Sequence, residues 1–280
     1  MIKDKVVSFV QSILSGISIF WMCIEAHNAL DQTNIWNINF YILLLVGVCI
    51  GTLWFFINGI LLQGFLKSSI EIRSNALQTN INVKFGDIFS QQGFIAISVN
   101  DFFDSLVDDK HISSNSLHGK MLKKYWAANT TDWDIQIENQ LKGVLEIEEL
   151  KRKDNAKSKR YEIGTTVITS IGPNKFLCTV LTKTNIDNLE CNTSLDDFLI
   201  AIQSMLIKAR SVCSGEPLNI PLLGSGLSRT GIKENIIIDL ILLVIFSESK
   251  KAKITDNINI ILPKAKRKDI NLLNILEDWS

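Results

Sequence analysis

The chain has 280 residues, with 29 basic and 29 acidic side chains that leave no formal net charge. This neutrality argues against a nucleic-acid-binding protein, which would carry a basic stripe. Its 46% share of hydrophobic residues is concentrated at one end, because the first 66 residues hold very few charges while Lys and Glu crowd the rest. Beyond that apolar part, roughly 200 residues remain, enough for one globular domain with a sizeable core.

Two apolar runs, residues 6–24 and 40–65, make up most of the N-terminal part. Each is long enough to cross the hydrocarbon core of a bilayer, so we expect a transmembrane helical hairpin over residues 1–66. Lysines precede the first run, and Lys67 and Arg73 follow the second, while the segment between the runs has no Lys or Arg. By the positive-inside rule, these charges predict a multi-pass membrane protein with both termini cytoplasmic.

Small and polar residues mark one face of each run. Ser12, Ser15 and Ser18 fall three apart on the first run, and Gly47 and Gly51 form a small-xxx-small pair on the second. Two interpretations fit these faces: close packing of a two-helix anchor, or contacts between protomers that line a polar path. Two helices alone cannot enclose a pore, so permeation would require a homo-oligomer.

The remainder of the chain alternates strands with helices. Residues 67–80 are expected to link the hairpin to a cytoplasmic domain over residues 81–280. Residues 154–160, together with the basic residues 151–153 before them, are expected to form a solvated charged loop. Strands are predicted at 81–85, 94–100, 161–171, 174–183, 218–223 and 257–262, and helices at 113–126, 132–150, 195–212 and 232–246, with Ser194 as an N-cap. This order predicts the α/β class, as an α/β/α sandwich with a mixed sheet.

The cysteines and histidines show no spacing typical of a metal site. We expect the five cysteines to be reduced thiols in core or helix positions. His111 and His118 are expected to be exposed polar residues. The sequence therefore predicts no metal site and no catalytic pairing.

Polar stretches follow three of the predicted strands, at residues 86–87, 100–101 and 224–226. In open α/β sheets, ligands bind at the carboxyl ends of the strands, so these stretches are expected to converge. In the third stretch, Gly224 and Gly226 let backbone N–H groups crowd around an anion, just before a helix N-terminus that favours phosphate. The three stretches together predict a pocket for a phosphate-containing ligand.

These motifs resemble those of the macro domain family, over roughly residues 81–265. The resemblance is carried by Gly86-Asp87-Ile88, Ser98-Val99-Asn100 and Pro221-Leu222-Leu223-Gly224-Ser225-Gly226-Leu227. A macro domain that follows two membrane spans is similar to the membrane-anchored effectors of Thoeris antiphage defence.

The resemblance implies a sensor of an ADP-ribose-derived signal, in the membrane-anchored branch a histidine conjugate of ADP-ribose, with no cofactor. A partner enzyme with a TIR domain would make the signal by consuming NAD on infection. Binding would then drive assembly into a homo-oligomer that disrupts the lipid bilayer and causes abortive infection.

The resemblance also implies a role for each motif. Asp87 would accept a hydrogen bond from the adenine amino group, Ile88 would pack beside the ring, and Asn100 would stand near the distal ribose. The diphosphate would be held by backbone N–H groups of Gly224, Ser225, Gly226 and Leu227, with the Ser228 hydroxyl as a further donor.

The chain departs from the commoner macro domain pattern after Asn100. A second Asn is missing, and Asp101-Phe102-Phe103-Asp104 follows instead. This loss puts de-ADP-ribosylating activity in doubt and fits a domain that reads its ligand without destroying it. Asp101 and Asp104 could meet a cationic group on a modified ADP-ribose, or begin a solvated helix. Two other functions stay open: a membrane-tethered ADP-ribosyl hydrolase, and a scaffold that recruits ADP-ribosylated partners.

Overall fold

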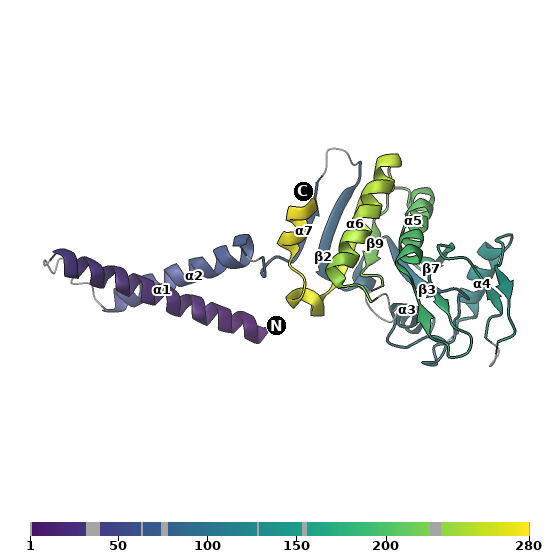
Figure 1. Ribbon diagram of the computed structural model, residues 1–280, viewed down its shortest axis with the longest axis horizontal. Helices are drawn as coiled ribbons and strands as arrows, with labels where there is room; N and C mark the ends of the chain where they lie inside the picture. The colour runs from purple at the N-terminus through teal and green to yellow at the C-terminus, as the bar shows by residue number, and fades with distance from the viewer. Residues whose placement is uncertain are drawn as a thin grey trace. The chain divides into compact units, whose positions relative to one another are not determined.

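The structure is a computed structural model that describes residues 2–31, 40–62, 64–73, 78–127, 129–152, 156–224 and 231–279 (Figure 1). The chain divides into two compact units. The first comprises Met1–Ser68 and Arg267–Asn274, and the second comprises Ser69–Lys266 and Ile275–Ser280.

The N-terminal unit contains two long helices. Helix α1 spans Ile2–Asp31, and α2 spans Phe40–Ile57 and continues into the π-helical turn η1 at Asn58–Leu62. Within them, Val6–His27 and Leu44–Leu62 are long and apolar enough to cross a membrane. These stretches overlap both predicted spans.

Glycines bring α1 and α2 into close backbone contact. A Cβ atom added to Gly51 would lie 2.4 Å from the Ser12 carbonyl oxygen, and one added to Gly16 would lie 2.5 Å from the Gly51 nitrogen. Gly47 faces the backbone of Ile17 in the same way, at 2.7 Å. The interpretation of the small residues as packing within a helix pair is therefore confirmed for Gly47 and Gly51.

The second unit is built on an eight-stranded sheet with the order β1-β2-β10-β9-β3-β7-β6, where β8 pairs with β7. The strands are β1 (Ser69–Ile72), β2 (Asn80–Gly86), β3 (Phe94–Asn100), β6 (Thr166–Ile171), β7 (Asn174–Thr184), β8 (Cys191–Asn192), β9 (Leu218–Pro221) and β10 (Asn257–Pro263). The five central strands are parallel, while β1 and β6 join the edges antiparallel. A separate hairpin pairs β4 (Glu148–Glu149) with β5 (Lys159–Arg160).

Helices cover both faces of this sheet. They are α3 (Leu117–Tyr125), α4 (Thr131–Leu141), α5 (Leu195–Val212) and α6 (Glu234–Lys251). The remaining helices are η2 (Ile88–Ser90), η3 (Lys264–Lys268) and α7 (Leu272–Trp279), and the last two hold residues of both units. On one face, Met121 of α3 and Trp133 of α4 join Phe176 and Cys178 of β7 in one hydrophobic core cluster. Helices α5 and α6 run side by side on the other face (Figure 1). The predicted α/β/α sandwich over a mixed sheet is confirmed.

Several element boundaries differ from the sequence-based expectation. Strand β1 lies within the stretch 67–80 that we expected to be a linker. The helix expected over 132–150 ends at Leu141, because Gly143 takes a left-handed conformation with φ of 84° and the chain then enters β4. Ser194 caps α5 as predicted, since its hydroxyl accepts a hydrogen bond from the Asp197 N–H.

Side chains of α4 close the outer edge of β6. The Gln136 side chain accepts from the Ser170 N–H at 2.8 Å and donates to the Ser170 carbonyl at 3.0 Å. Gln140 makes the same two contacts with Ile168. These amides take the place of a further strand, and they protect the edge from pairing with another chain.

A buried carboxylate joins α5 to α6. Glu248 is 1% exposed and accepts hydrogen bonds from Gln203 at 2.8 Å, Arg210 at 3.2 Å and Lys251 at 2.5 Å. Burial alone would raise the pKa of Glu248, but the hydrogen bonds from Lys251, Gln203 and Arg210 together lower it below its usual 4.5.

We expect Glu248→Gln to reduce the free energy of unfolding by about 2 kcal/mol at pH 7, because it removes a charge that three donors stabilise. Since the folded pKa lies below the unfolded one, this stabilisation is complete above the unfolded pKa and is lost as the pH falls through the folded pKa. Urea titration of the detergent-solubilised chain at several pH values measures both effects.

The matched control is Glu216→Gln, which removes an exposed partner of Lys175 and should change stability little. Equal losses for the two variants at pH 7, or a Glu248→Gln deficit that grows on acidification, would contradict this account of the α5–α6 contact.

Candidate functional site

A two-lobed cleft lies at the carboxyl ends of the parallel strands. One lobe, of about 430 Å³, is lined by Asp87, Ile88 and Gly224, and we call it the Asp87 lobe. The other, of about 520 Å³, includes Asn100 and is called the Asn100 lobe. The two lobes adjoin, because both are lined by Ser98, Ser116 and His118. The predicted convergence of strand ends at one edge of the sheet is therefore present.

Strand register sets the floor of the Asp87 lobe. Gly86 at the end of β2 is paired with Pro263 of β10, and Ile261 of β10 is paired with Pro221 of β9. The three strands thus end at nearly the same level. The polar residues that follow them project from one edge, although they are far apart in the sequence.

The Asp87 side chain is held by the short helix that follows it. Asp87 is the N-cap of η2, and its Oδ1 accepts a hydrogen bond from the Phe89 N–H at 3.0 Å. The residue is exposed, so its second carboxylate oxygen can meet a ligand. Ile88, which is 8% exposed, and Phe89 line the same lobe and give it an apolar wall.

The third motif enters the cleft at Gly224. This residue has a left-handed φ of 77°, which favours glycine and turns the chain after Leu223. Ser225, Gly226, Leu227 and Ser228 lie outside the described residues. Their expected contacts with a diphosphate therefore stay a prediction.

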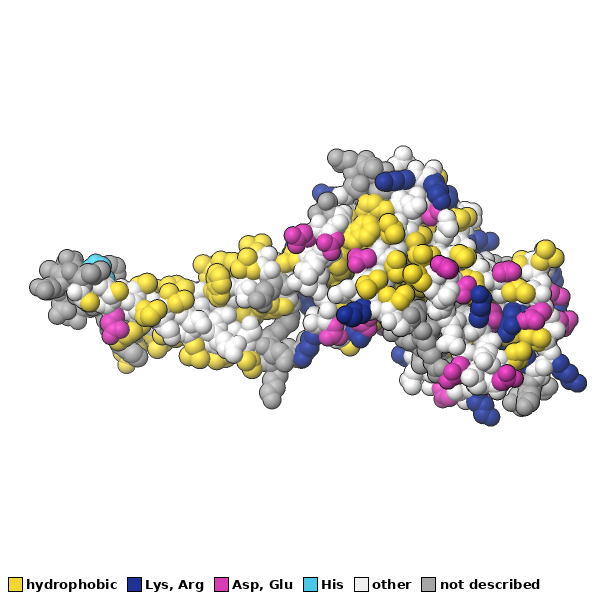
Figure 2. All heavy atoms as spheres, viewed as in Figure 1, with side chains coloured by type: hydrophobic (Ala, Val, Ile, Leu, Met, Phe, Trp, Pro, Cys, Tyr) yellow, Lys and Arg dark blue, Asp and Glu magenta, His cyan; other side chains and the backbone are white. Residues whose placement is uncertain are grey.

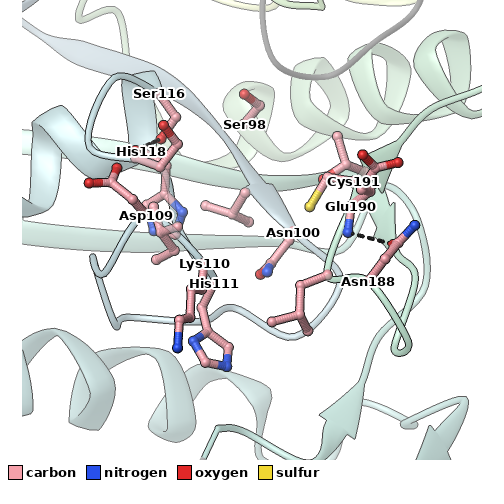
Figure 3. Close-up of a pocket in the computed structure, with 15 residues that line it drawn as sticks. Ser98, Asn100, Asp109, Lys110, His111, Ser116, His118, Asn188, Glu190 and Cys191 are labelled. Atoms are coloured by element: carbon pink, nitrogen blue, oxygen red, sulfur yellow. Dashed lines mark hydrogen bonds between the residues drawn. The ribbon is translucent and has the colours of Figure 1, made fainter.

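Asn100 stands at a register shift between β3 and β7, next to Val99. Its amide is fixed from both ends: Oδ1 accepts from the Asp104 N–H at 3.0 Å, and Nδ2 donates to Asp104 Oδ2 at 2.7 Å. Figure 3 shows Asn100 among the residues that line this lobe. Asp104 therefore positions Asn100 from behind the lobe.

Asp101 and Asp104 are not available to a ligand in the way we expected from the sequence. Asp101 is 1% exposed and pairs with Arg160 at 2.9 Å, and Asp104 is 2% exposed and pairs with Arg152 at 2.8 Å. Neither aspartate lines the two lobes. Burial raises the pKa of Asp101, against the opposing effects of Thr184 and Arg160. The expected solvated helix start is also wrong, because both carboxylates are buried.

The basic segment that we expected to be a solvated loop supplies these partners. Arg152 and Arg160 lie over the Phe102 ring, with guanidinium-to-centroid distances of 4.0 and 4.9 Å. Lys157 pairs with Asp134 of α4 at 2.5 Å. The segment thus neutralises buried carboxylates behind the cleft, which are distant in sequence.

His111 and His118 are both buried, which corrects the expectation that they are exposed. His111 is 6% exposed, and its Nδ1 lies 2.9 Å from Asp108 Oδ2. Burial alone would raise the pKa of Asp108, but hydrogen bonds from His111 and from the backbone of His111 and Lys110 lower it to about 2. His111 lines the Asn100 lobe, so a histidine does lie beside one of the motifs.

His118 lies where the two lobes meet, 5.4 Å from the Trp133 ring. Burial, with a smaller contribution from the charge of Lys157, lowers the pKa of His118 to about 3. The imidazole is therefore neutral at physiological pH.

One wall of the Asn100 lobe was not predicted from the sequence. It is formed by the loop after β7, where Asn188 Oδ1 accepts from the Glu190 N–H at 2.9 Å (Figure 3). Because β7 is parallel to β3, its carboxyl end lies at the same edge of the sheet. Applying the strand-end rule to β7 would have found Asn188, Glu190 and Cys191.

The titratable residues of the described part of the chain form no cluster of three or more that could hold a metal ion. Cys178 and Cys213 are buried free thiols, and burial raises the pKa of each to about 12.

The two adjoining lobes are suited to binding an extended polar ligand, with one end beside Asp87 and the other beside Asn100.

Comparison with known proteins supports this geometry at the level of fold. The Oceanobacillus iheyensis macrodomain with ADP superposes with a TM-score of 0.50 at 15% sequence identity, covering 75% of this chain and 98% of that one. The same macrodomain with MES bound gives a TM-score of 0.50 at 13% identity, with coverage of 75% and 98%.

Sequence comparison is more specific. Thoeris protein ThsA of Bacillus amyloliquefaciens (strain Y2) is 24% identical over 213 residues, which cover 74% of this chain and 70% of that protein. The family model of the macro domain of Thoeris protein ThsA matches residues 81–263, well over half of the chain. The chain therefore belongs to the Thoeris ThsA macro domain family.

Proposed function

We propose that this protein is a membrane-anchored sensor of antiphage defence that binds an ADP-ribose-derived signal in the two-lobed cleft. One observation carries the proposal: two adjoining lobes at the strand ends, with the fixed Asp87 carboxylate in one and the fixed Asn100 amide in the other. Membership of the ThsA macro domain family supports the same ligand class.

In this proposal the adenosine half occupies the Asp87 lobe. The free oxygen of Asp87 accepts a hydrogen bond from the adenine amino group, and Ile88 packs beside the ring. Gly224 and the residues from Ser225 to Ser228 hold the diphosphate through backbone N–H groups and the Ser228 hydroxyl.

The distal half then occupies the Asn100 lobe. Asn100 contacts the distal ribose, and the remaining space toward His111 and Glu190 receives the group attached to it. We propose a histidine conjugate of ADP-ribose as that signal, made from NAD by a TIR-domain partner.

The two apolar helices support the effector half of the proposal. They anchor the protein in the cell inner membrane with both termini cytoplasmic, and ligand binding shifts the protomers toward an assembled state that disrupts the bilayer. Such a shift requires only that the signal bind the assembled state more tightly than the separate protomers.

Asp87→Asn tests the adenine contact most cleanly. Asparagine keeps the N-cap of η2 but replaces the charged acceptor with an amide, so the fold is retained while ligand affinity falls. We expect the Kd for ADP-ribose to rise about tenfold to a hundredfold, the range for loss of a charge-assisted hydrogen bond. Calorimetry on the full chain in nanodiscs measures it. Unaltered affinity would show that Asp87 does not contact the ligand.

Gly226→Glu tests the diphosphate contact, because it places bulk and negative charge where phosphate is expected. Binding of ADP-ribose should be lost while the variant stays folded and in the membrane. Gly172→Asp is a control, since Gly172 lies at the turn between β6 and β7 with open space around it, and aspartate adds the same charge while tolerating the φ of 55° there better than glutamate does. If Gly226→Glu still binds ADP-ribose, the loop that contains Gly226 does not contact the ligand.

Dye release from liposomes separates the effector from a passive scaffold. Reconstituted protein should release the dye only after addition of the histidine conjugate of ADP-ribose, and Asp87→Asn should release less at the same ligand concentration. Tight binding without ligand-dependent release would favour the scaffold.

The Asp108–His111 pair favours a second candidate function, hydrolysis of ADP-ribose conjugates. The carboxylate holds Nδ1, so Nε2 can take a proton from water that attacks the distal ribose carbon, and can return it to the leaving group. Incubation with a conjugate should then release free ADP-ribose, and His111→Gln should stop release without loss of binding. If the unmodified chain does not turn over the conjugate, hydrolysis is excluded and the sensor proposal remains.

A further inference from the structure

The chain passes from apolar to basic just after the second apolar helix. Exposed apolar side chains such as Leu53 and Leu62 cover this helix, and Figure 2 shows hydrophobic side chains along both α1 and α2. Phe65 still belongs to the apolar part, because it makes a T-shaped contact with Phe55 of α2, with ring centroids 5.5 Å apart. Lys67 follows two residues later. Such a change marks the level at which a span leaves the hydrocarbon core.

A segment from the other end of the chain is fixed at this boundary. The Arg267 guanidinium donates to the carbonyl oxygens of Leu66 and Lys67, at 2.8 and 2.9 Å, although 201 and 200 positions separate them from Arg267 in the sequence. Leu273 of the same segment packs against Gly64, since a Cβ atom added to Gly64 would lie 2.7 Å from Leu273 Cγ. All of these residues belong to the N-terminal unit. The start of this C-terminal segment therefore lies at the end of the second apolar helix.

The fixed segment is basic. It begins within the short helix η3, whose sequence is Lys264-Ala265-Lys266-Arg267-Lys268. Lys264 and Lys268 are exposed, and Lys67 is half-buried. Residues 64–73 and 264–274 together hold six basic residues and only two acidic ones, so the two segments that meet at this boundary carry a net positive charge.

The acidic side chains of these segments do not neutralise this charge. Glu71 is paired with Arg73 at 2.9 Å, and Lys266 is paired with Glu234 of α6 at 2.6 Å. Lys233, next to Glu234, adds a further positive charge. With both pairs set aside, the two segments still hold four basic residues against one aspartate, Asp269. We call these four residues the basic cluster: Lys67, Lys264, Arg267 and Lys268.

We propose that the basic cluster binds the phosphodiester groups of anionic phospholipids, in the leaflet where the second apolar helix ends. Its position favours lipid as the partner, because Arg267 is bonded to the residues directly after the span and so lies close to the headgroups. A group of four Lys and Arg residues beside a span is of the size that recognises anionic headgroups. Only the presence of the bilayer at this level rests on the membrane anchoring of the proposed function.

Arginine and lysine have different parts in the cluster. Arg267 donates to two carbonyl oxygens, so it mainly positions the segment. The ammonium groups of Lys67, Lys264 and Lys268 act as point charges for phosphate. Attraction between such exposed charges and an anionic surface falls off within about 10 Å at 0.1 M salt. Lipid binding should therefore weaken at high salt and with each lysine removed.

The test uses the full chain in a nonionic detergent and native mass spectrometry, which resolves each bound lipid by its mass. The probes are dioctanoyl phosphatidylglycerol, which is anionic, and dioctanoyl phosphatidylcholine, which is zwitterionic. We expect phosphatidylglycerol to bind about tenfold more tightly than phosphatidylcholine, or better. This difference should shrink when the ammonium acetate concentration is raised to about 0.5 M, because salt screens the attraction.

Two lysines from opposite ends of the chain test the convergence. Lys67→Gln and Lys268→Gln should each raise the Kd for phosphatidylglycerol about fivefold, and the double variant about twentyfold, while the Kd for phosphatidylcholine stays the same. An unchanged melting temperature shows that the double variant is folded. Lys208→Gln combined with Lys250→Gln is the matched control. It removes two charges near the C-terminal ends of α5 and α6, whereas the partner of Lys266 lies at the start of α6, so neither Kd should change.

Three results would overturn the proposal. They are equal affinity for the two lipids, a folded double variant that binds phosphatidylglycerol as tightly as the unmodified chain, and an equal loss of binding in the control. Competition with sn-glycerol 3-phosphate gives a fourth, because displacement of phosphatidylglycerol at equal concentration would assign the cluster to a soluble phosphate.

ADP-ribose binding, measured on the same samples, separates this inference from the proposed function. Preference for phosphatidylglycerol without nucleotide binding would refute the proposed ligand and leave the lipid contact standing. Nucleotide binding without lipid preference would do the reverse.

Discussion

The parallel register of five central strands is the constraint on which the rest depends. It brings the ends of β2, β9 and β10 to one level, with β3 and β7 beside them, so that short polar segments distant in sequence meet at one edge. Each lobe of the cleft is lined mainly by residues that follow strand ends, together with the start of α3. The site is thus a consequence of topology, and its chemistry is set by which side chains occupy those ends.

Buried ion pairs next to the cleft hold this edge of the sheet in place. Arg152, through Asp104, fixes the amide of Asn100, and Arg160 neutralises Asp101 beside it. Removing one partner of such a pair leaves an uncompensated buried charge, which costs more than the pair itself contributes. Arg152 and the hairpin of β4 and β5 therefore support the cleft without lining it. A rigidly held amide suits a domain that recognises its ligand with preorganised groups.

Sequence patterns predicted the sandwich, the helix pair and the alternation of strands and helices along the chain, because these follow from local periodicity and strand-end motifs. Asp87, Ile88, Asn100 and Gly224 were placed correctly in the cleft for the same reason. Ion pairs between residues distant in sequence could not be predicted, because nothing near Asp101 in the sequence indicates Arg160 as its partner. The burial of His111 likewise depends on how the loop after β3 folds back, and the helix expected to reach residue 150 stops where Gly143 turns the chain.

The central claim is that a nucleotide sugar diphosphate binds along this edge of the sheet. Hydrogen–deuterium exchange of the full chain, with and without saturating ADP-ribose, tests it directly, because it reports backbone protection segment by segment. The account predicts slower exchange at residues 86–90, 98–100 and 221–230, with little change in α5 and α6. Unchanged exchange in those three segments, or protection confined to another surface, would contradict it.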